Sequence, residues 1–396
     1  MQETHTLEQD KARAKRKIWA HSGDSHFIEP KGLWNDILPK ALADRMPHIE
    51  EVEMDGRPME RIQVDGQVFH FPIPKVAQKR TDGKKSMAEL SHAAEGARNL
   101  GARIADLDQE GIWGEVVYSS AGLWEGMIQD RELIRRAAAA ENAWKVREVQ
   151  GVAKDRLIAV ASLPMRDIDD TVAEVKHAAE IGMYAVSMPS PALPNSRTYD
   201  TSVPALNMVY WEPLWQVLED TGLVAAFHIG GDASEHTMYS GPGGAVLNYT
   251  NSTYSGQRAA MVMTASGALD RHPRLKVLVS EGGAAWVPFL ADRMEEAYRQ
   301  HQIFVRPKLS RGPKEILYSQ VYCSFQHEAS AIPTLTASGY QNVMFGSDYP
   351  HLEGTFGHTQ ETLHDLFDDQ PEAVRRRITQ GSFKELFPHV SSPPAS

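Results

Sequence analysis

Short apolar runs alternate along the chain with longer stretches in which apolar residues recur at helical spacing. The runs are rich in Val, Ile and Leu and do not alternate with polar positions, which is typical of strands buried on both faces of a parallel sheet. They predict eight strands, at 17–26, 113–120, 156–164, 183–190, 223–230, 275–282, 319–325 and 342–350.

Amphipathic stretches between these runs predict helices, and the clearest are residues 169–182, 210–222 and 285–302. The first two end in Gly182 and Gly222, which is a common signal for a helix C-terminus. Eight strand–helix units in one chain predict an α/β protein, a distorted (β/α)8 TIM barrel, with an open doubly wound sheet as the alternative.

Two stretches are too long to be simple connections in such a barrel. Residues 45–100, after the first strand, contain a hairpin signal around Asp65 and Gly66 and then a polar tract. Residues 230–258, after the fifth strand, are rich in Gly, Ser and Thr and predict a long irregular loop. Long loops after barrel strands commonly carry binding residues, so we expect both insertions to shape a site.

The two ends of the chain differ in composition from the rest. We expect a charged N-terminal arm at 1–17, a barrel over 18–388 that includes the inserted segment, and a disordered tail at 389–396.

Composition narrows the possible partners. The chain of 396 residues has a net charge of -11 and no long basic run, which argues against nucleic acid or an anionic membrane as the main partner. No stretch reaches the roughly 18 uncharged apolar residues of a membrane span. The single cysteine, Cys323, fits a reducing compartment. We therefore expect a cytoplasmic protein that acts on a small molecule, and we expect a homo-oligomer, namely a dimer.

The stretch "GDSHFIEP" at 23–30 contains the first candidate chemistry. Asp24 and His26 are two residues apart, so both side chains would point to one side at the C-terminal end of the first strand, where barrel active sites lie. His228 and Asp348 end the fifth and eighth strands in the same way. Each residue alone has an ordinary structural explanation, but together they predict a mixed nitrogen–oxygen site for Zn, Mn or Fe.

Four segments of the sequence together resemble one known family. They are "DSHFIEPKGLW", "FHIGG", "EGGAAWVPFLADRM" and "MFGSDYPHLEGTF". The resemblance is to the amidohydrolase-related family, the branch of the amidohydrolase superfamily that contains aminocarboxymuconate-semialdehyde decarboxylase and the resorcylate-type decarboxylases. It implies a distorted (β/α)8 barrel with one divalent metal ion, held by Asp24, His26, His228 and Asp348.

The sequence departs from this family pattern at informative positions. Many relatives begin with H-x-H or E-x-H, whereas Asp24 here makes the site more anionic and favours Mn or Fe somewhat over Zn. Glu281 stands where the decarboxylases have a proton-transferring histidine. A glutamate there can act as an acid or base, or it can orient a neighbouring ligand. The fourth strand offers no bridging Lys or Glu, so we expect one metal ion.

Two enzymatic functions fit these residues. In hydrolysis of an amide, ester or lactone of a small aromatic or cyclic acid, the metal acidifies water and Asp348 moves the proton. In nonoxidative decarboxylation of an aromatic or unsaturated acid, Glu281 would have to supply the proton. A third function, binding or scaffolding without catalysis, is disfavoured, because polar metal ligands such as His228 are costly to bury without a metal.

Three further residues are weaker candidates for contact with substrate. His351 follows Asp348 by three positions and could line the mouth of the barrel. Arg258 could anchor a substrate carboxylate, and Trp124 follows the second strand.

Overall fold

The protein is described here from a computed structural model, which describes residues 17–30, 32–54, 57–72, 94–120, 124–191, 202–229, 239–351 and 353–394. Most of the expected N-terminal arm lies outside these residues. So do parts of the two expected insertions and the end of the expected tail.

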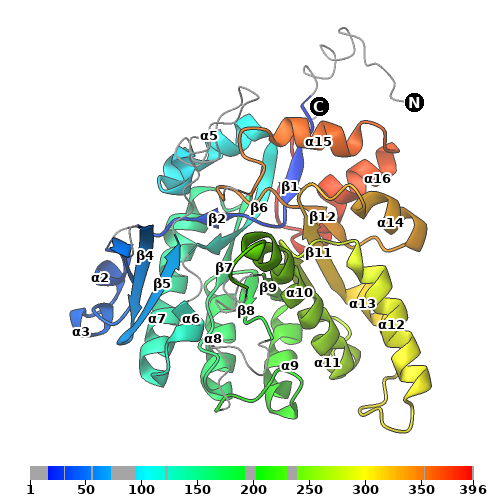
Figure 1. Ribbon diagram of the computed structural model, residues 1–396, viewed down its shortest axis with the longest axis horizontal. Coiled ribbons are helices and arrows are strands. Elements are labelled where there is room, and N and C mark those ends of the chain that lie inside the picture. Colours follow the sequence, from blue (N-terminus) through cyan, green and yellow to red (C-terminus); the bar gives the residue numbers. More distant parts are fainter. Residues whose placement is uncertain are drawn as a thin grey trace.

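The central element is a ring of parallel strands surrounded by helices, as Figure 1 shows. The strands pair in chain order around the ring, and β1 and β2 together form the first position. This is the predicted (β/α)8 barrel. The barrel strands are β1 (Ala20–Ser22), β2 (His26–Phe27), β6 (Ile112–Ser119), β7 (Leu157–Ala161), β8 (Ala185–Met188), β9 (Val224–His228), β10 (Val277–Ser280), β11 (Val321–Phe325) and β12 (Val343–Phe345).

The prediction of eight strand positions is confirmed, and so are the three helices named from the sequence, which correspond to α8, α9 and α12. The helices are α2 (Leu33–Ile37), α3 (Lys40–Ala43), α5 (Leu100–Glu110), α6 (Trp124–Met127), α7 (Arg131–Trp144), α8 (Ile168–Glu180), α9 (Glu212–Thr221), α10 (Gly244–Ala265), α11 (Ala268–Arg271), α12 (Trp286–Gln300), α13 (Pro313–Gln320), α14 (Ala331–Ser338), α15 (Thr359–Phe367), α16 (Glu372–Arg376) and α17 (Ser382–Leu386).

Backbone hydrogen bonds between the first and last strand positions close the ring. Gly23 N donates to Phe345 O at 2.8 Å, and Asp348 N donates to Asp24 O at 2.9 Å. The second of these bonds ties together two of the residues that the sequence analysis proposed as metal ligands. Closure of the barrel therefore places the first and last candidate ligands side by side.

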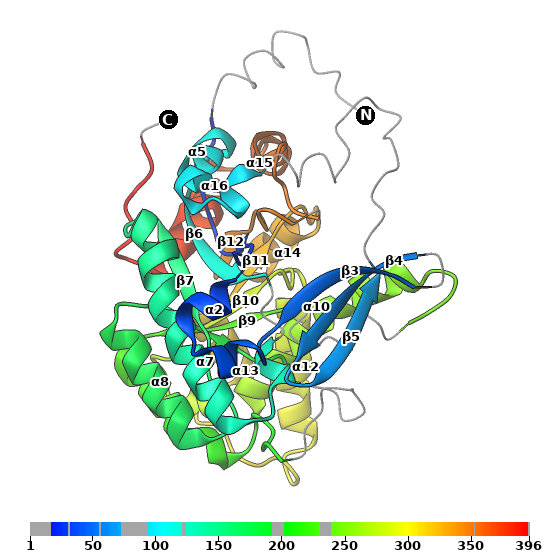
Figure 2. The same ribbon diagram turned by 90° about the vertical axis from the view of Figure 1, so that its left-hand side faces the viewer.

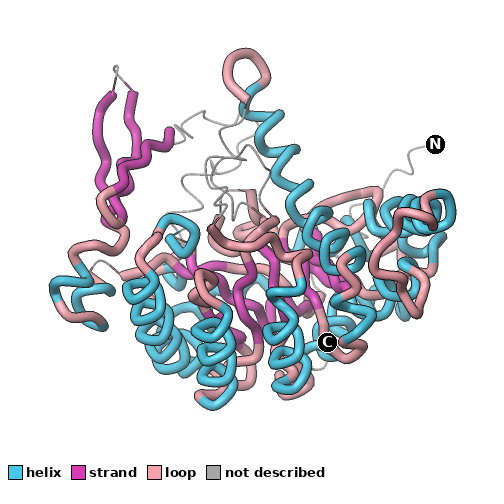
Figure 3. The backbone as a smooth tube through the Cα atoms, turned by 90° about the horizontal axis from the view of Figure 1, so that it is seen from below, coloured by secondary structure: helices cyan, strands magenta, loops and turns pink. Residues whose placement is uncertain are grey.

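The insertion after the first strand contains a three-stranded antiparallel sheet of β3 (His48–Met54), β4 (Arg57–Val64) and β5 (Gln67–Pro72). Val64 pairs with Gln67 across the turn, so the hairpin predicted at Asp65 and Gly66 is present. This sheet stands away from the barrel in Figures 2 and 3.

The prediction of an irregular loop over 230–258 is wrong for much of that stretch, because α10 begins at Gly244. Its Gly, Ser and Thr residues have low helix propensity, which tertiary packing overrides here. A Cβ atom on Gly256 would lie 2.5 Å from Val279 Cγ1, so only a glycine lets the helix approach β10 this closely. The small residues that suggested a loop serve this close packing.

The apolar core has two layers. The larger cluster fills the space between strands and helices, and a second cluster lies inside the ring. The inner cluster includes Phe383, Phe387 and Val390 from the C-terminal segment, which closes the bottom of the barrel. Ser391 N also donates to Asp155 O at 2.8 Å, so residues 389–391 pack onto the barrel instead of forming the expected disordered tail. Among the described residues, no helix is long and apolar enough to cross a membrane.

Candidate metal centre

Six side chains that could together hold a metal ion gather at the C-terminal end of the barrel, five of them near strand ends and His351 beside them. Asp24 lies between β1 and β2, His26 opens β2, and His228 ends β9. Glu281 directly follows β10, and Asp348 follows β12 by three residues. Each residue stands where a parallel strand ends, so the ring of strands aims all five at one point.

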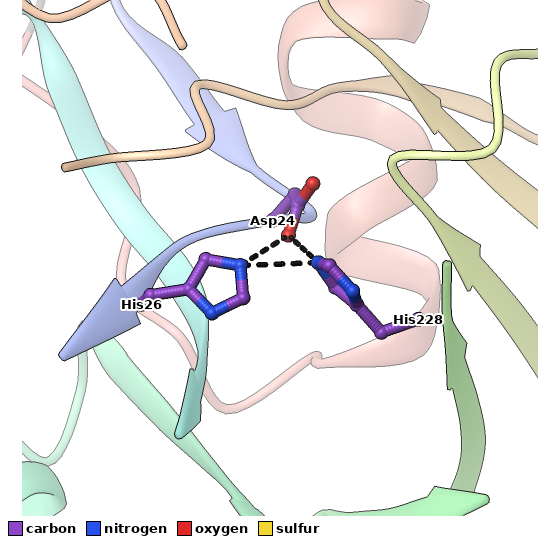
Figure 4. Close-up of side chains that lie close together, drawn as sticks. All are labelled: Asp24, His26 and His228. Carbon is purple, nitrogen blue, oxygen red and sulfur yellow. Dashed lines mark hydrogen bonds and ion pairs between the residues drawn. The ribbon is translucent and has the colours of Figure 1, made fainter. Parts of the chain in front are cut away.

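The two imidazoles and the first carboxylate are close together, as Figure 4 shows. His26 Nε2 lies 3.0 Å from His228 Nε2. Asp24 Oδ1 lies 3.2 Å from His228 Nε2 and 3.7 Å from His26 Nε2. Two nitrogen atoms and one oxygen atom therefore face one another from two segments of the chain that are far apart in the sequence.

The other two carboxylates extend this cluster. Asp348 Oδ1 lies 3.5 Å from His26 Nε2, and Glu281 Oε2 lies 3.3 Å from His228 Nε2. Oxygen atoms of Asp24, Glu281 and Asp348 also lie within 4.8 Å of one another. The structure thus places Glu281 beside the four residues that the resemblance implied as ligands.

These spacings fit a metal ion. Ligand atoms about 2.0–2.2 Å from one ion stand roughly 2.8–3.6 Å apart when they are neighbours in octahedral or tetrahedral geometry. The spacings from 3.0 to 3.5 Å in this cluster lie in that range. Asp24 Oδ2 is buried and has no hydrogen-bond partner among the described residues, as expected of an oxygen atom reserved for a cation.

The charges of the cluster favour a cation. Burial alone would lower the pKa of His228, but the carboxylates of Asp24, Glu281 and Asp348 raise it to about 9. Burial, followed by the charge of a neighbouring carboxylate, raises the pKa of both Glu281 and Asp348. A divalent ion would offset the negative charge of these buried carboxylates.

The backbone is unusual at two of the five residues. Glu281 has φ 57° and Asp348 has φ 50°, the left-handed conformation that residues other than glycine rarely adopt. Such strain persists where the surrounding structure enforces it, and it concentrates at functional sites. At both positions it turns the carboxylate toward the barrel axis directly after a strand.

A buried ion pair contacts the segment that carries Asp24 and His26. Arg103 on α5 pairs with Glu115 on β6, and both side chains are fully buried. Arg103 Nη1 also donates to His26 O at 2.8 Å, and Nη2 donates to Ser25 Oγ at 3.1 Å. The sequence analysis missed Arg103, because an arginine within a helix gives no sign of the segment that it contacts.

Tyr118 on β6 lies beneath the two imidazoles and was also missed. Its ring centre is 4.9 Å from that of His228 and 5.8 Å from that of His26. Its hydroxyl lies 2.7 Å from Ser280 Oγ, which donates to Gly23 O. The only signal in the sequence was that Tyr118 lies within a run of apolar strand residues, where a hydroxyl group would face the inside of the barrel.

His351 lies beside the cluster. Its Nδ1 atom is 2.9 Å from Asp348 Oδ1, and its ring stacks on that of His26 with the centres 3.9 Å apart. The side chain is 31% exposed, whereas that of Asp348 is fully buried. His351 therefore connects the buried carboxylate to the accessible side of the site.

The remaining two candidates for substrate contact have partners outside the donor residues. Trp124 is buried and packs edge-on against Trp34, with the ring centres 5.2 Å apart. Arg258 on α10 donates to Pro191 O at 3.1 Å.

Tyr249, on the same helix, was missed because its segment was expected to be a loop. Burial raises the pKa of Tyr249, and the charges of Glu281 and other nearby carboxylates raise it further.

Comparison with known proteins gives one family match. The family model described as amidohydrolase matches residues 80–382. The decarboxylase yanB of Aspergillus niger is 25% identical over 195 residues, which are 46% of this chain and 50% of that protein. The chain thus matches about half the length of this curated relative.

Solved structures share the whole fold at low sequence identity. An amidohydrolase of Mycobacterium avium subsp. paratuberculosis is 21% identical with a TM-score of 0.74, and the match covers 94% of this chain and 98% of that one. A dihydroxybenzoic acid decarboxylase of Polaromonas, solved with bound manganese and the inhibitor 2-nitroresorcinol, is 16% identical with a TM-score of 0.59. That match covers 94% of this chain and 98% of the decarboxylase.

Proposed function

The chain belongs to the amidohydrolase family, a family of enzymes, and we propose that it is a metal-dependent hydrolase. Its substrate would be an amide, ester or lactone of a small organic acid, aromatic or cyclic in character. The observation that supports this proposal most is the meeting of three carboxylates and two imidazoles at the end of the barrel.

Asp24, His26, His228 and Asp348 would hold one divalent ion, with Glu281 as an additional donor. Three carboxylates and two imidazoles form a hard, anionic donor set, which favours manganese or iron and also accepts zinc. When bound, the ion would supply Lewis acidity, which polarises a carbonyl group and makes water more acidic. Manganese in the similar decarboxylase structure supports it as the first metal to test.

Asp348 and His351 would move the proton. A carboxylate whose pKa is raised by burial is a better base than an ordinary one, and Asp348 is such a group. Its Oδ1 atom is 2.9 Å from His351 Nδ1, so a proton accepted by Asp348 would have only a short distance to travel to a partly exposed imidazole. His351 can then deliver it to the leaving group.

The charge of the site favours a neutral reacting group. When the bound ion keeps all three carboxylates ionised and both imidazoles are neutral ligands, the carboxylates outweigh the charge of one divalent ion. A substrate carboxylate at the ion would therefore meet net negative charge, whereas a carbonyl oxygen would not. This comparison supports hydrolysis over decarboxylation.

Decarboxylation is the second candidate, and the relative named decarboxylase yanB favours it. It would require protonated Glu281 to donate to a ring carbon. Burial raises the pKa of Glu281, so this role is chemically possible.

One assay separates the two reactions. Protein reconstituted with manganese is incubated with a panel of aryl esters, amides and lactones and, separately, with hydroxybenzoic acids. Release of acid without carbon dioxide, lost on chelation and restored by metal, is the expected result. Carbon dioxide release from the acids would instead establish the second candidate. Absence of turnover in both panels at full metal loading would count against both.

A further inference from the structure

Strand β11 places a buried glutamine at the open end of the barrel. Tyr322 on this strand belongs to the inner core cluster, whereas Cys323 and Phe325 belong to the outer one. Because side chains alternate along a strand, Ser324 and Gln326 face the barrel axis. Gln326 directly follows the last residue of β11 and is only 7% exposed.

The order of the strands sets Gln326 between two carboxylates of the metal cluster. β11 lies between β10 and β12 (Figure 2), and these two strands lead to Glu281 and Asp348. Phe325 pairs with Phe345 in the sheet, so Gln326 begins its loop beside the short segment that ends at Asp348. A side chain that faces the axis from this position is directed into the site.

The other inward-facing polar residue of this strand end also serves the site. Ser324 is 1% exposed, and its Oγ atom accepts a hydrogen bond from Glu281 N at 3.1 Å. This bond holds the backbone at the residue whose φ is 57°. The end of β11 therefore supports the cluster through Ser324 and presents Gln326 beside it.

The amide nitrogen of Gln326 has no hydrogen-bond partner among the described residues, although it is buried. Asp348 Oδ2 is buried and lacks a partner within the same part of the chain. The two side chains are nevertheless close, because Gln326 opposes the rise in the pKa of Asp348 that burial causes. A donor and an acceptor thus stand near each other without a full hydrogen bond between them.

A water molecule suits this pair of atoms. Its oxygen accepts a hydrogen bond and its O–H group donates one, so a single water satisfies both Nε2 and Oδ2. A substrate carbonyl oxygen can only accept, and it would leave the Asp348 oxygen facing a second acceptor. A buried donor or acceptor that stays unpaired is costly, which favours the group that pairs with both.

We propose that Gln326 and Asp348 together hold the water molecule that attacks the substrate, with Gln326 Nε2 donating to the water oxygen. The inference rests on the proposed hydrolase function. In the reaction the water oxygen forms a bond to the carbonyl carbon and one water proton passes to Asp348. The bond to the leaving group then breaks as that group takes up a proton from His351.

The residue type fits this role. The amide of glutamine is uncharged, so it adds no negative charge to a site that already contains three carboxylates. Its N–H group donates only, which fixes the orientation of the water: the oxygen turns to Gln326 and a proton turns to Asp348. Such orientation lowers the barrier because the attacking atom is held in place before the reaction.

The first test is Gln326→Leu, which removes the donor and keeps approximately the same length. We expect kcat for the aryl ester that the parent hydrolyses fastest to fall by about 10²-fold, with KM nearly unchanged. Manganese affinity, measured by isothermal titration, should stay at the parental value because an N–H donor does not bind a cation. Gln326→Met, which is unbranched like glutamine, repeats the test in case leucine disturbs the packing.

Gln150→Leu is the matched control. Gln150 is likewise buried, at 5% exposed, but its amide donates to Gly182 O at 2.8 Å in the connection before β8, at the closed end of the barrel. Its loss should lower the unfolding temperature and leave kcat at the parental value. Gln326→Leu should show the opposite pattern, since it breaks no hydrogen bond to another described residue.

The second test follows the attacking molecule itself. Methanol added to the assay competes with water for the acyl group, and the products are the methyl ester and the free acid. In Gln326→Leu the share of methyl ester should rise, because leucine favours the methyl group of methanol and no longer binds the water. A residue that serves only the fold would lower both products in equal proportion.

Four results would overturn the proposal. They are a parental kcat in Gln326→Leu, a rise in KM alone, a loss of manganese, and a lower kcat with an unchanged share of methyl ester. The second would mean that the amide binds the substrate, and the third that it supports the ion. A parent that releases carbon dioxide and hydrolyses no ester would overturn the hydrolase function together with this inference, whereas an active parent with an unaffected leucine variant overturns the inference alone.

Discussion

Glu281 Oε2 lies 3.3 Å from Nε2 of His228, and the two residues end adjacent parallel strands. The pairing of Ser280 with His228 in the sheet sets this arrangement, because it brings the residue after Ser280 to the level of the imidazole. Glu281 is therefore within reach of the same ion as His228, in a backbone conformation that costs energy to maintain.

The variant Glu281→Gln tests this role. An amide oxygen is a weaker ligand than a carboxylate, so we expect manganese affinity to fall by about 10–100-fold or more, with activity following metal occupancy. Isothermal titration with manganese and rate measurements on the same preparation give both quantities. Glu328→Gln is the matched control, because Glu328 accepts a hydrogen bond from Ala284 N and lies outside the donor groups. Full metal content with no activity would instead make Glu281 a proton donor.

His228→Ala should remove the metal without unfolding the protein. The imidazole lies at the open end of the barrel and contacts mainly other polar groups of the site, so its loss creates little apolar cavity. It also removes one of the two imidazole nitrogen atoms of the site, which leaves the ion with fewer ligands. Metal analysis and thermal unfolding should show metal loss with a nearly unchanged fold. Retained metal with unchanged turnover would refute the assignment of His228.

His351→Asn should separate proton transfer from metal binding. Asparagine preserves the approximate size and polarity of the side chain but cannot carry the proton from Asp348. We expect kcat to fall by about 10²–10⁴-fold while bound metal stays constant. His301→Asn, in an exposed histidine after α12, is the control. Loss of metal in His351→Asn would mean that the imidazole is itself a ligand.

The strand ends of this site were predictable from the sequence. Asp24, His228 and Asp348 each follow an apolar strand run, and a parallel barrel collects the ends of its strands on one face. The order of the strands was therefore enough to predict that these three residues lie close together, and helix packing did not have to be known. Glu281 was recognised from the family resemblance, because it stands where the decarboxylases have a histidine, but its distance from His228 depends on strand register and on the turn at φ 57°.

Contributions from helices were not predictable in this way. Arg103 reaches the site only because α5 packs on β6, which a periodic helix pattern does not specify. Tyr249 lies on a helix whose Gly, Ser and Thr residues resemble those of a loop when local propensity is considered alone. In both cases tertiary packing decides the position, and the local sequence carries no signal of it.

The last prediction concerns His21, which is buried on β1 at the closed end of the barrel. Its ring stacks on that of Phe383, with the centres 4.7 Å apart and the planes 13° from parallel. Burial, together with the positive charges of Lys384 and Arg156, lowers the pKa of His21 from 6.5 to about 3. The folded protein therefore keeps this imidazole neutral where the unfolded chain would protonate it.

The sign of the pH effect follows from this difference. Between pH 6.5 and about 3 the unfolded state binds one more proton at His21, so acid favours unfolding. The free energy of unfolding should lose at most about 1.4 kcal/mol per pH unit from this residue. His21→Phe keeps the stacked ring and removes the titration, so the stability of the metal-free variant should fall less steeply below pH 6.5 than that of the parent. Urea unfolding of metal-free protein between pH 7 and about 5 measures the slope, and His48→Phe, at an exposed position on β3, should retain the parental slope. An equal slope in His21→Phe and the parent would show that protonation of His21 does not oppose folding.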